Sequence, residues 1–125
     1  MRGCGWLKTN FIMKIRTINI PIYFDKLTII ITDDFKKVDK LFKTKIGNSK
    51  YDGVCFDKKD EYVIALKKIE WSIIAHEVVH IVNSIYLKCG IQLDRVNDEP
   101  QAYLTGWIIN EIDKFVKESS SESKL

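Results

Sequence analysis

The sequence contains few residues that break or cross-link a chain. Of its 125 residues, 2 are proline, 6 are glycine and 3 are cysteine. The cysteines, Cys4, Cys55 and Cys89, are odd in number, far apart and without a CxxC pair. This pattern argues against a disulfide framework and favours a reducing compartment, so we expect a cytoplasmic protein. Long hydrophobic runs are also missing, and basic residues interrupt the N-terminal segment, so we expect neither a membrane span nor a signal peptide.

Arginine is scarce as well. The chain has 20 lysines and arginines against 17 acidic residues, for a net charge of +3, and only three of the basic residues are arginine. The lysines are spread along the chain and form no dense basic stripe, so no nucleic-acid partner and no membrane partner is expected. With 46% hydrophobic and 30% charged residues, the composition is typical of one globular domain.

The hydrophobic pattern predicts an α+β fold, with a small mixed, mostly antiparallel sheet and helices packed against it. Asp33 or Asp34 is expected to cap the first helix, and Pro100 to lie in the first turn of the last one. The helix after the hairpin is apolar on nearly all sides, which predicts a buried helix. The expected elements are strands at 14–24 and 26–32, a helix after 34, a hairpin whose turn spans 57–60, a helix at 70–88, and a helix from 97–100 to about 116.

The ends of the chain are interpreted separately from this domain. Met13 reads like a natural start, so residues 1–12 are either an N-terminal extension with little structural role or part of the fold. Residues 13–117 form the expected domain. Residues 118–125 are polar and serine-rich, which predicts a disordered tail.

The sequence AHEVVH, residues 75–80, contains the only two histidines of the chain. Residues four apart on a helix project from one face with Cβ atoms about 5–6 Å apart. Both imidazoles of His76 and His80 can therefore reach one zinc ion at about 2.0–2.1 Å. Glu77 lies close enough to take a proton from a water at the metal, as in the HExxH motif of zinc peptidases. The alternative is that both histidines are ordinary residues of a buried helix.

A catalytic zinc ion needs a third protein ligand and one open position. A third histidine is excluded, so carboxylates and Cys89 remain. Cys89 lies at the far end of the same helix. Asp94 lies in the following link, and Glu99 lies at the start of the next helix.

HExxH followed by a glutamate at this spacing resembles the gluzincin metallopeptidases, the thermolysin-like division of the zincins. The stretch from HEVVHIVN to NDEPQAYLTGWI is most similar to small single-domain zincin-like proteins of bacteria and phages, some called minigluzincins. The resemblance implies a minimal zincin-like domain with two antiparallel helices facing each other across the metal. It assigns His76, His80 and Glu99 as zinc ligands and Glu77 as the general base. Any additional substrate domain of the larger gluzincins is missing.

Two further roles follow less directly. The resemblance implies an antiparallel edge strand above the HExxH helix, and residues 61–66 fit that place, although an ordinary hairpin strand fits them equally. Tyr103, one turn beyond Glu99, is a candidate to stabilise the oxyanion. Tyr51, Tyr62 and Tyr86 are its rivals, and a core tyrosine is the default interpretation.

The leading hypothesis is therefore a zinc-dependent metallopeptidase that acts on a peptide or protein substrate. One alternative is a zinc-binding module of the same scaffold, weakly active or inactive, that acts as a regulatory or protein-binding factor. The other is a metal-free α+β domain.

Overall fold

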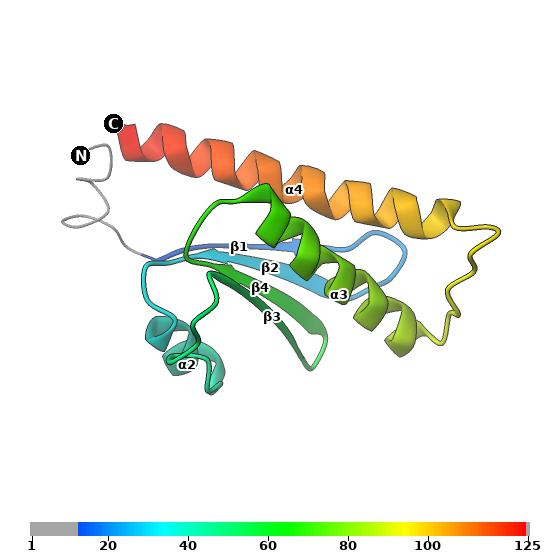
Figure 1. Ribbon diagram of the computed structural model, residues 1–125, viewed down its shortest axis with the longest axis horizontal. Helices are drawn as coiled ribbons and strands as arrows, with labels where there is room; N and C mark the ends of the chain where they lie inside the picture. The colour runs from blue at the N-terminus through cyan, green and yellow to red at the C-terminus, as the bar shows by residue number, and fades with distance from the viewer. Residues whose placement is uncertain (1–12, 125) are drawn as a thin grey trace.

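The computed structural model describes residues 13–124 (Figure 1), so the interpretation of residues 1–12 lies outside the described part of the chain. The fold is α+β, as predicted, with a four-stranded mixed sheet. The predicted order of strands and helices is also confirmed. In chain order, the elements are β1 (Lys14–Asn19), β2 (Lys26–Ile31), α2 (Lys36–Phe42), β3 (Gly53–Lys58), β4 (Glu61–Leu66), α3 (Trp71–Cys89) and α4 (Glu99–Lys124).

The sheet has the strand order β1-β2-β4-β3. β1 pairs antiparallel with β2, β2 pairs parallel with β4, and β3 forms the predicted hairpin with β4. The parallel pair requires a crossover, which the segment containing α2 supplies. Asp60 has a φ of 62° in the tight β3–β4 turn.

Of the two interpretations of residues 61–66, the edge strand is wrong and the ordinary hairpin strand is confirmed. These residues form β4, which pairs with β2 on one side and with β3 on the other. The reason is burial, because every residue of β4 after Glu61 is buried, as expected of a strand covered on both faces. The edge strand beside α3 is β3, which is only partly buried and ends in the exposed pair Asp57 and Lys58.

The two faces of the sheet carry separate apolar clusters. α3 and α4 cover one face and α2 packs on the other (Figure 1). Alternation along β2 sends Leu27, Ile29 and Ile31 to the α3 side and Ile30 to the α2 side. The larger cluster joins the sheet to both long helices through Ile74, Val78, Ile81, Ile85, Leu104, Ile108 and Ile112.

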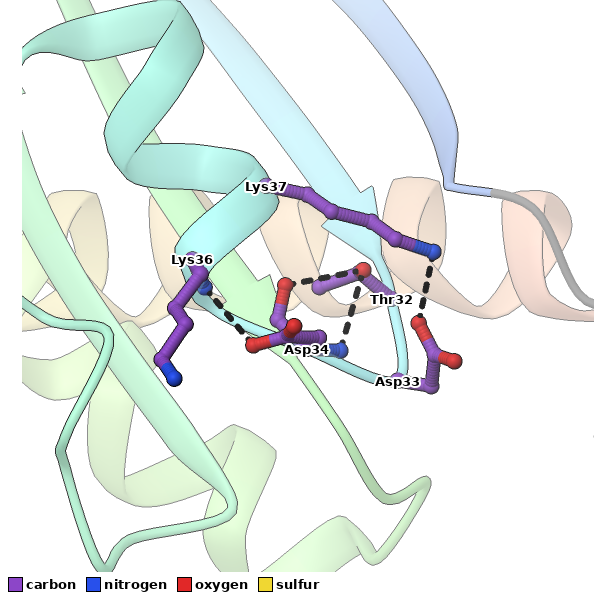
Figure 2. A network of polar contacts seen from close by, with 5 residues as sticks. All are labelled: Thr32, Asp33, Asp34, Lys36 and Lys37. Carbon is purple, nitrogen blue, oxygen red and sulfur yellow. Dashed lines mark hydrogen bonds and ion pairs between the residues drawn. The ribbon is translucent and has the colours of Figure 1, made fainter.

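Figure 2 shows how the chain enters α2. The Asp34 carboxylate accepts a hydrogen bond of 2.9 Å from the Lys36 N–H, while Asp33 pairs with the Lys37 ammonium at 2.9 Å. The N-cap residue of α2 is Phe35, so the prediction that Asp33 or Asp34 caps this helix is wrong. The Asp34 carboxylate accepts a hydrogen bond from the first helical N–H from one position further out. The Thr32 hydroxyl and the Asp34 backbone are mutually hydrogen-bonded at 3.3 Å and fix the exit from β2.

Helix α3 is buried on its inner side only, so the prediction of a helix buried nearly all round is wrong. Val79 is 51% exposed and Leu87 83% exposed. His76 and His80 are also exposed. The sheet and α4 cover two sides of α3 and leave a third open to solvent.

Helix α4 runs to Lys124, so the predicted end near Val116 is wrong. The helix includes residues 118–124, which were expected to belong to a polar tail. Two basic residues of β1 explain the extension. The Lys14 ammonium donates a 3.0 Å hydrogen bond to the Ser119 carbonyl. Arg16 pairs with Glu118 at 2.5 Å and lies 4.9 Å above the Phe115 ring. The hydrogen bond from Arg16 also lowers the pKa of Glu118. None of the helices described between residues 13 and 124 is both long and apolar enough to cross a membrane.

Gly53 lies at a close approach of β3 to α3, and we predict that Gly53→Ala destabilises the fold by about 1–3 kcal/mol. A Cβ at this position would lie 2.5 Å from Ile73 Cγ2 and 3.3 Å from Leu66 Cδ2. Ile73 has little freedom to move away, because a β-branched side chain is stiff in a helix. Equilibrium urea unfolding measures the change in the free energy of unfolding.

Gly106→Ala is the matched control, because a Cβ at Gly106 in α4 meets nothing within 4 Å. Helix propensity predicts that this variant is stabilised by up to about 1 kcal/mol. Equal effects of the two substitutions would contradict the close approach at Gly53.

Candidate metal centre

The two histidines meet on the open face of α3. The Nε2 atoms of His76 and His80 are 3.3 Å apart. Their ring centroids are 4.9 Å apart, and the ring planes are inclined at 75°. The His76 side chain is 68% exposed, so the pair can be reached from solvent.

This separation is the one that a shared metal requires. Two nitrogens that each bind one tetrahedral zinc at about 2.0–2.1 Å are about 3.3–3.4 Å from each other. The same distance also suits a hydrogen bond between one ring nitrogen that carries a proton and one that does not. In either state, the helix holds the two nitrogens in the geometry of a bidentate ligand.

Glu77 points away from solvent, toward β3. Its side chain is 13% exposed, and its Oε2 atom lies 3.9 Å from the His76 Nε2. Cys55 of β3 lies close enough for Glu77 to contribute to the raised pKa of its thiol. The carboxylate therefore lies between α3 and the edge strand, next to the histidine pair.

A cleft of about 530 Å³ runs between α3 and β3 and contains this group. A second hollow of about 380 Å³ continues it past Gly53 toward the loop before β3, and the two share Tyr51, Gly53, His76 and Glu77. Gly53 lines both hollows, and a Cβ at this position would lie 2.5 Å from Ile73 Cγ2 and 3.7 Å from Glu77 Cγ. The cleft is lined by Tyr51, Gly53, Val54, Cys55, Phe56, Asp57, Tyr62, His76, Glu77, His80, Ile81 and Ser84.

Two groups in the cleft have raised pKa values. Burial, and then the hydrogen bond and charge of Glu77, raise the pKa of the Cys55 thiol to about 12. Burial, followed by the charge of Asp25, raises the pKa of the Tyr62 hydroxyl. Both groups thus carry their protons at neutral pH.

Glu99 and Tyr103 are not brought to the histidine pair. Glu99 is the first residue of α4 and is exposed. Tyr103 is 73% exposed and lines a separate groove with Ile22 and Trp107. Within residues 13–124, no three His, Cys, Asp or Glu side chains gather in a way that could hold a metal. The three-ligand set with Glu99, and the role of Tyr103, remain predictions.

The connection between the helices accounts for this separation. Residues 90–98 carry the chain past the C-terminal end of α3, so that Pro100 and Gln101 lie beside Tyr86. The histidines instead face β3, on the other side of α3. Cys89 and Asp94 also lie toward this end of α3, because Cys89 is its last residue and Asp94 lies with Tyr86 in that hollow.

Gly53, Cys55 and Asp57 belong to the cleft but were not predicted from the sequence. The hairpin was predicted correctly, and alternation along β3 places these residues on one face of the strand. The sequence did not show that β3 lies at the edge of the sheet, because this position depends on the parallel pairing of β2 with β4. Comparison with known proteins found no matching family model, no similar curated protein and no similar solved structure.

We predict that the purified chain binds one zinc ion through His76 and His80. Free zinc at a hundredfold excess over its dissociation constant should raise the free energy of unfolding by about 2.7 kcal/mol. Isothermal titration calorimetry gives the stoichiometry, and thermal unfolding gives the stabilisation. His80→Ala should lose both effects, whereas Asn83→Ala, an exposed polar residue of the same helix, should keep them. Equal zinc binding by the two variants would show that the metal binds elsewhere.

Proposed function

We propose that this chain is a zinc-dependent metallopeptidase, in which His76 and His80 are zinc ligands and Glu77 is the general base. The observation that carries the proposal is the 3.3 Å separation of the two Nε2 atoms, with the Glu77 carboxylate beside them in the cleft. Burying a carboxylate costs free energy, and the Glu77 side chain is only 13% exposed. A buried carboxylate next to two exposed histidines is therefore better explained by a functional site than by chance.

The residues of the cleft divide the reaction between them. When bound, zinc supplies Lewis-acid chemistry, which makes water a stronger nucleophile at neutral pH and polarises the scissile carbonyl. Glu77 accepts a proton as water attacks, and then donates it to the amine leaving group. The two imidazoles fix the metal, and their four-residue spacing on α3 holds them without any contribution from a loop.

The edge strand gives the substrate a place to bind. β3 pairs with β4 on one side only, so its other side presents backbone N–H and C=O groups along the cleft. An extended peptide can add to this edge through main-chain hydrogen bonds, which require little of its sequence. The proposed substrate is therefore an extended segment of a peptide or protein.

We further propose that the domain is a minimal zincin-like fold of the gluzincin type. An edge strand beside an HExxH helix supports this, with β3 in the place first predicted for residues 61–66. The gluzincin ligand set is complete only if Glu99 reaches the metal. This requires the exposed segment 90–99 to bring the first turn of α4 to the histidine face of α3. The free cysteines Cys55 and Cys89 suit the proposed cytoplasmic location.

A second function has its own support. Glu99 and Tyr103 lie apart from the histidine pair, and two protein ligands hold zinc more weakly than three. This arrangement favours a zinc-binding module that is weakly active or inactive and serves as a regulatory or protein-binding factor. The two functions differ in one measurement, which is whether zinc-loaded protein cleaves any member of a peptide library.

Glu77→Gln tests the peptidase proposal. The variant should lose cleavage by roughly a hundredfold or more, because the proton acceptor is gone. It should keep its zinc, since Glu77 is not a proposed ligand. Digestion of a peptide library, followed by mass spectrometry and elemental analysis of the same samples, measures both properties. Glu70→Gln, an exposed glutamate just before α3, is the matched control and should leave both unchanged. Undiminished cleavage by Glu77→Gln would refute the assigned role.

A further inference from the structure

The environment of Glu77 poses a physical problem. Its side chain is 13% exposed, whereas that of neighbouring His76 is 68% exposed. A carboxylate removed from water needs hydrogen-bond donors to offset the lost solvation. The His76 Nε2 lies 3.9 Å away, which is too far for a direct hydrogen bond. The Cys55 thiol lines the same cleft, and Glu77 contributes to its raised pKa, so it is the neighbouring group that can supply a donor.

Strand β3 brings Cys55 to this position. Cys55 packs against the apolar cluster under α3, whereas its neighbours Val54 and Phe56 pack on the α2 side of the sheet. Cys55 lies opposite Ile64 of β4, which is fully buried in the same cluster. Two residues earlier, a Cβ on Gly53 would lie 3.7 Å from Glu77 Cγ, so α3 passes directly over this strand.

The direction of the hydrogen bond follows from protonation. Burial and the adjacent carboxylate raise the pKa of the Cys55 thiol to about 12, so the thiol keeps its proton at neutral pH. A thiol that carries its proton can donate a hydrogen bond to a carboxylate oxygen, so a bond between these two side chains would run from Cys55 to Glu77.

We propose that Cys55 is a positioning residue for Glu77, because its thiol donates a hydrogen bond that keeps the carboxylate in the cleft beside the histidine pair. The bond restricts the side-chain conformers that would carry the carboxylate out to solvent. Its consequence for catalysis rests on the proposed peptidase function. The contact between Cys55 and Glu77 does not depend on that function, and it can be tested through the reactivity of the thiol.

The first experiment measures the rate at which iodoacetamide alkylates Cys55 in the purified full-length chain at pH 8, by peptide mapping with mass spectrometry. Removal of the neighbouring charge in Glu77→Gln lowers the thiol pKa, so alkylation should be roughly three- to tenfold faster. Cys89, exposed at the end of α3, is an internal control and should react at an unchanged rate. Glu70→Gln should change neither rate.

The second experiment compares peptide cleavage by the zinc-loaded wild type and three variants. Loss of one hydrogen bond predicts that Cys55→Ala lowers kcat roughly three- to tenfold while KM stays within about twofold. Cys55→Ser keeps a donor and should restore most of the lost kcat. Val38→Ala removes apolar atoms from the cluster on the α2 side of the sheet, away from the cleft, and should change kcat less than Cys55→Ala does.

Each result decides the matter. Faster alkylation of Cys55 in Glu77→Gln, together with a kcat that falls in Cys55→Ala and recovers in Cys55→Ser, supports the proposal. An alkylation rate of Cys55 that is the same in wild type and Glu77→Gln overturns it, and so does a kcat of Cys55→Ala equal to that of the wild type. If the wild type cleaves no peptide, the peptidase function fails, and the alkylation rates alone decide whether Cys55 holds Glu77.

Discussion

The close approach of α3 to β3 at Gly53 is the constraint on which the candidate site depends. An added Cβ there would lie 2.5 Å from Ile73, so no larger residue fits without displacing the helix. Gly53 and the largely buried Glu77 line the same cleft, and a Cβ on Gly53 would lie 3.7 Å from Glu77 Cγ. The histidines lie further round the same helix, where the strand no longer covers them. One short contact therefore decides which polar groups of α3 are buried and which are open.

Much of the fold could be predicted from local pattern. The α+β class, the order of the elements and the hairpin turn all follow from hydrophobic periodicity and from a few turn and cap residues such as Gly90. The pairing order of the strands could not be predicted in this way. A run such as that of β4, apolar throughout, is compatible with an edge or a centre, and only its partners in space decide between them.

The histidine pair shows the same division between local and distant information. Its geometry is local, since four residues of helix bring both Nε2 atoms together. Its surroundings are not local. The apolar sequence of α3 suggests burial on all sides, yet the open face arises because the sheet and α4 pack on two sides only. The position of Glu99 depends in turn on the path of residues 90–98, for which the sequence offers no periodic signal.

The pairing of β1 with the end of α4 has a consequence for folding. Lys14 and Ser119 are 105 positions apart, and Arg16 and Glu118 are 102 apart. Contacts of such long range form only after the entropy of closing nearly the whole described chain has been lost. The sheet and α3 can form through contacts of shorter range. The last turns of α4 become stable only when they pack against β1. Protection of these turns against hydrogen exchange should therefore appear late in refolding.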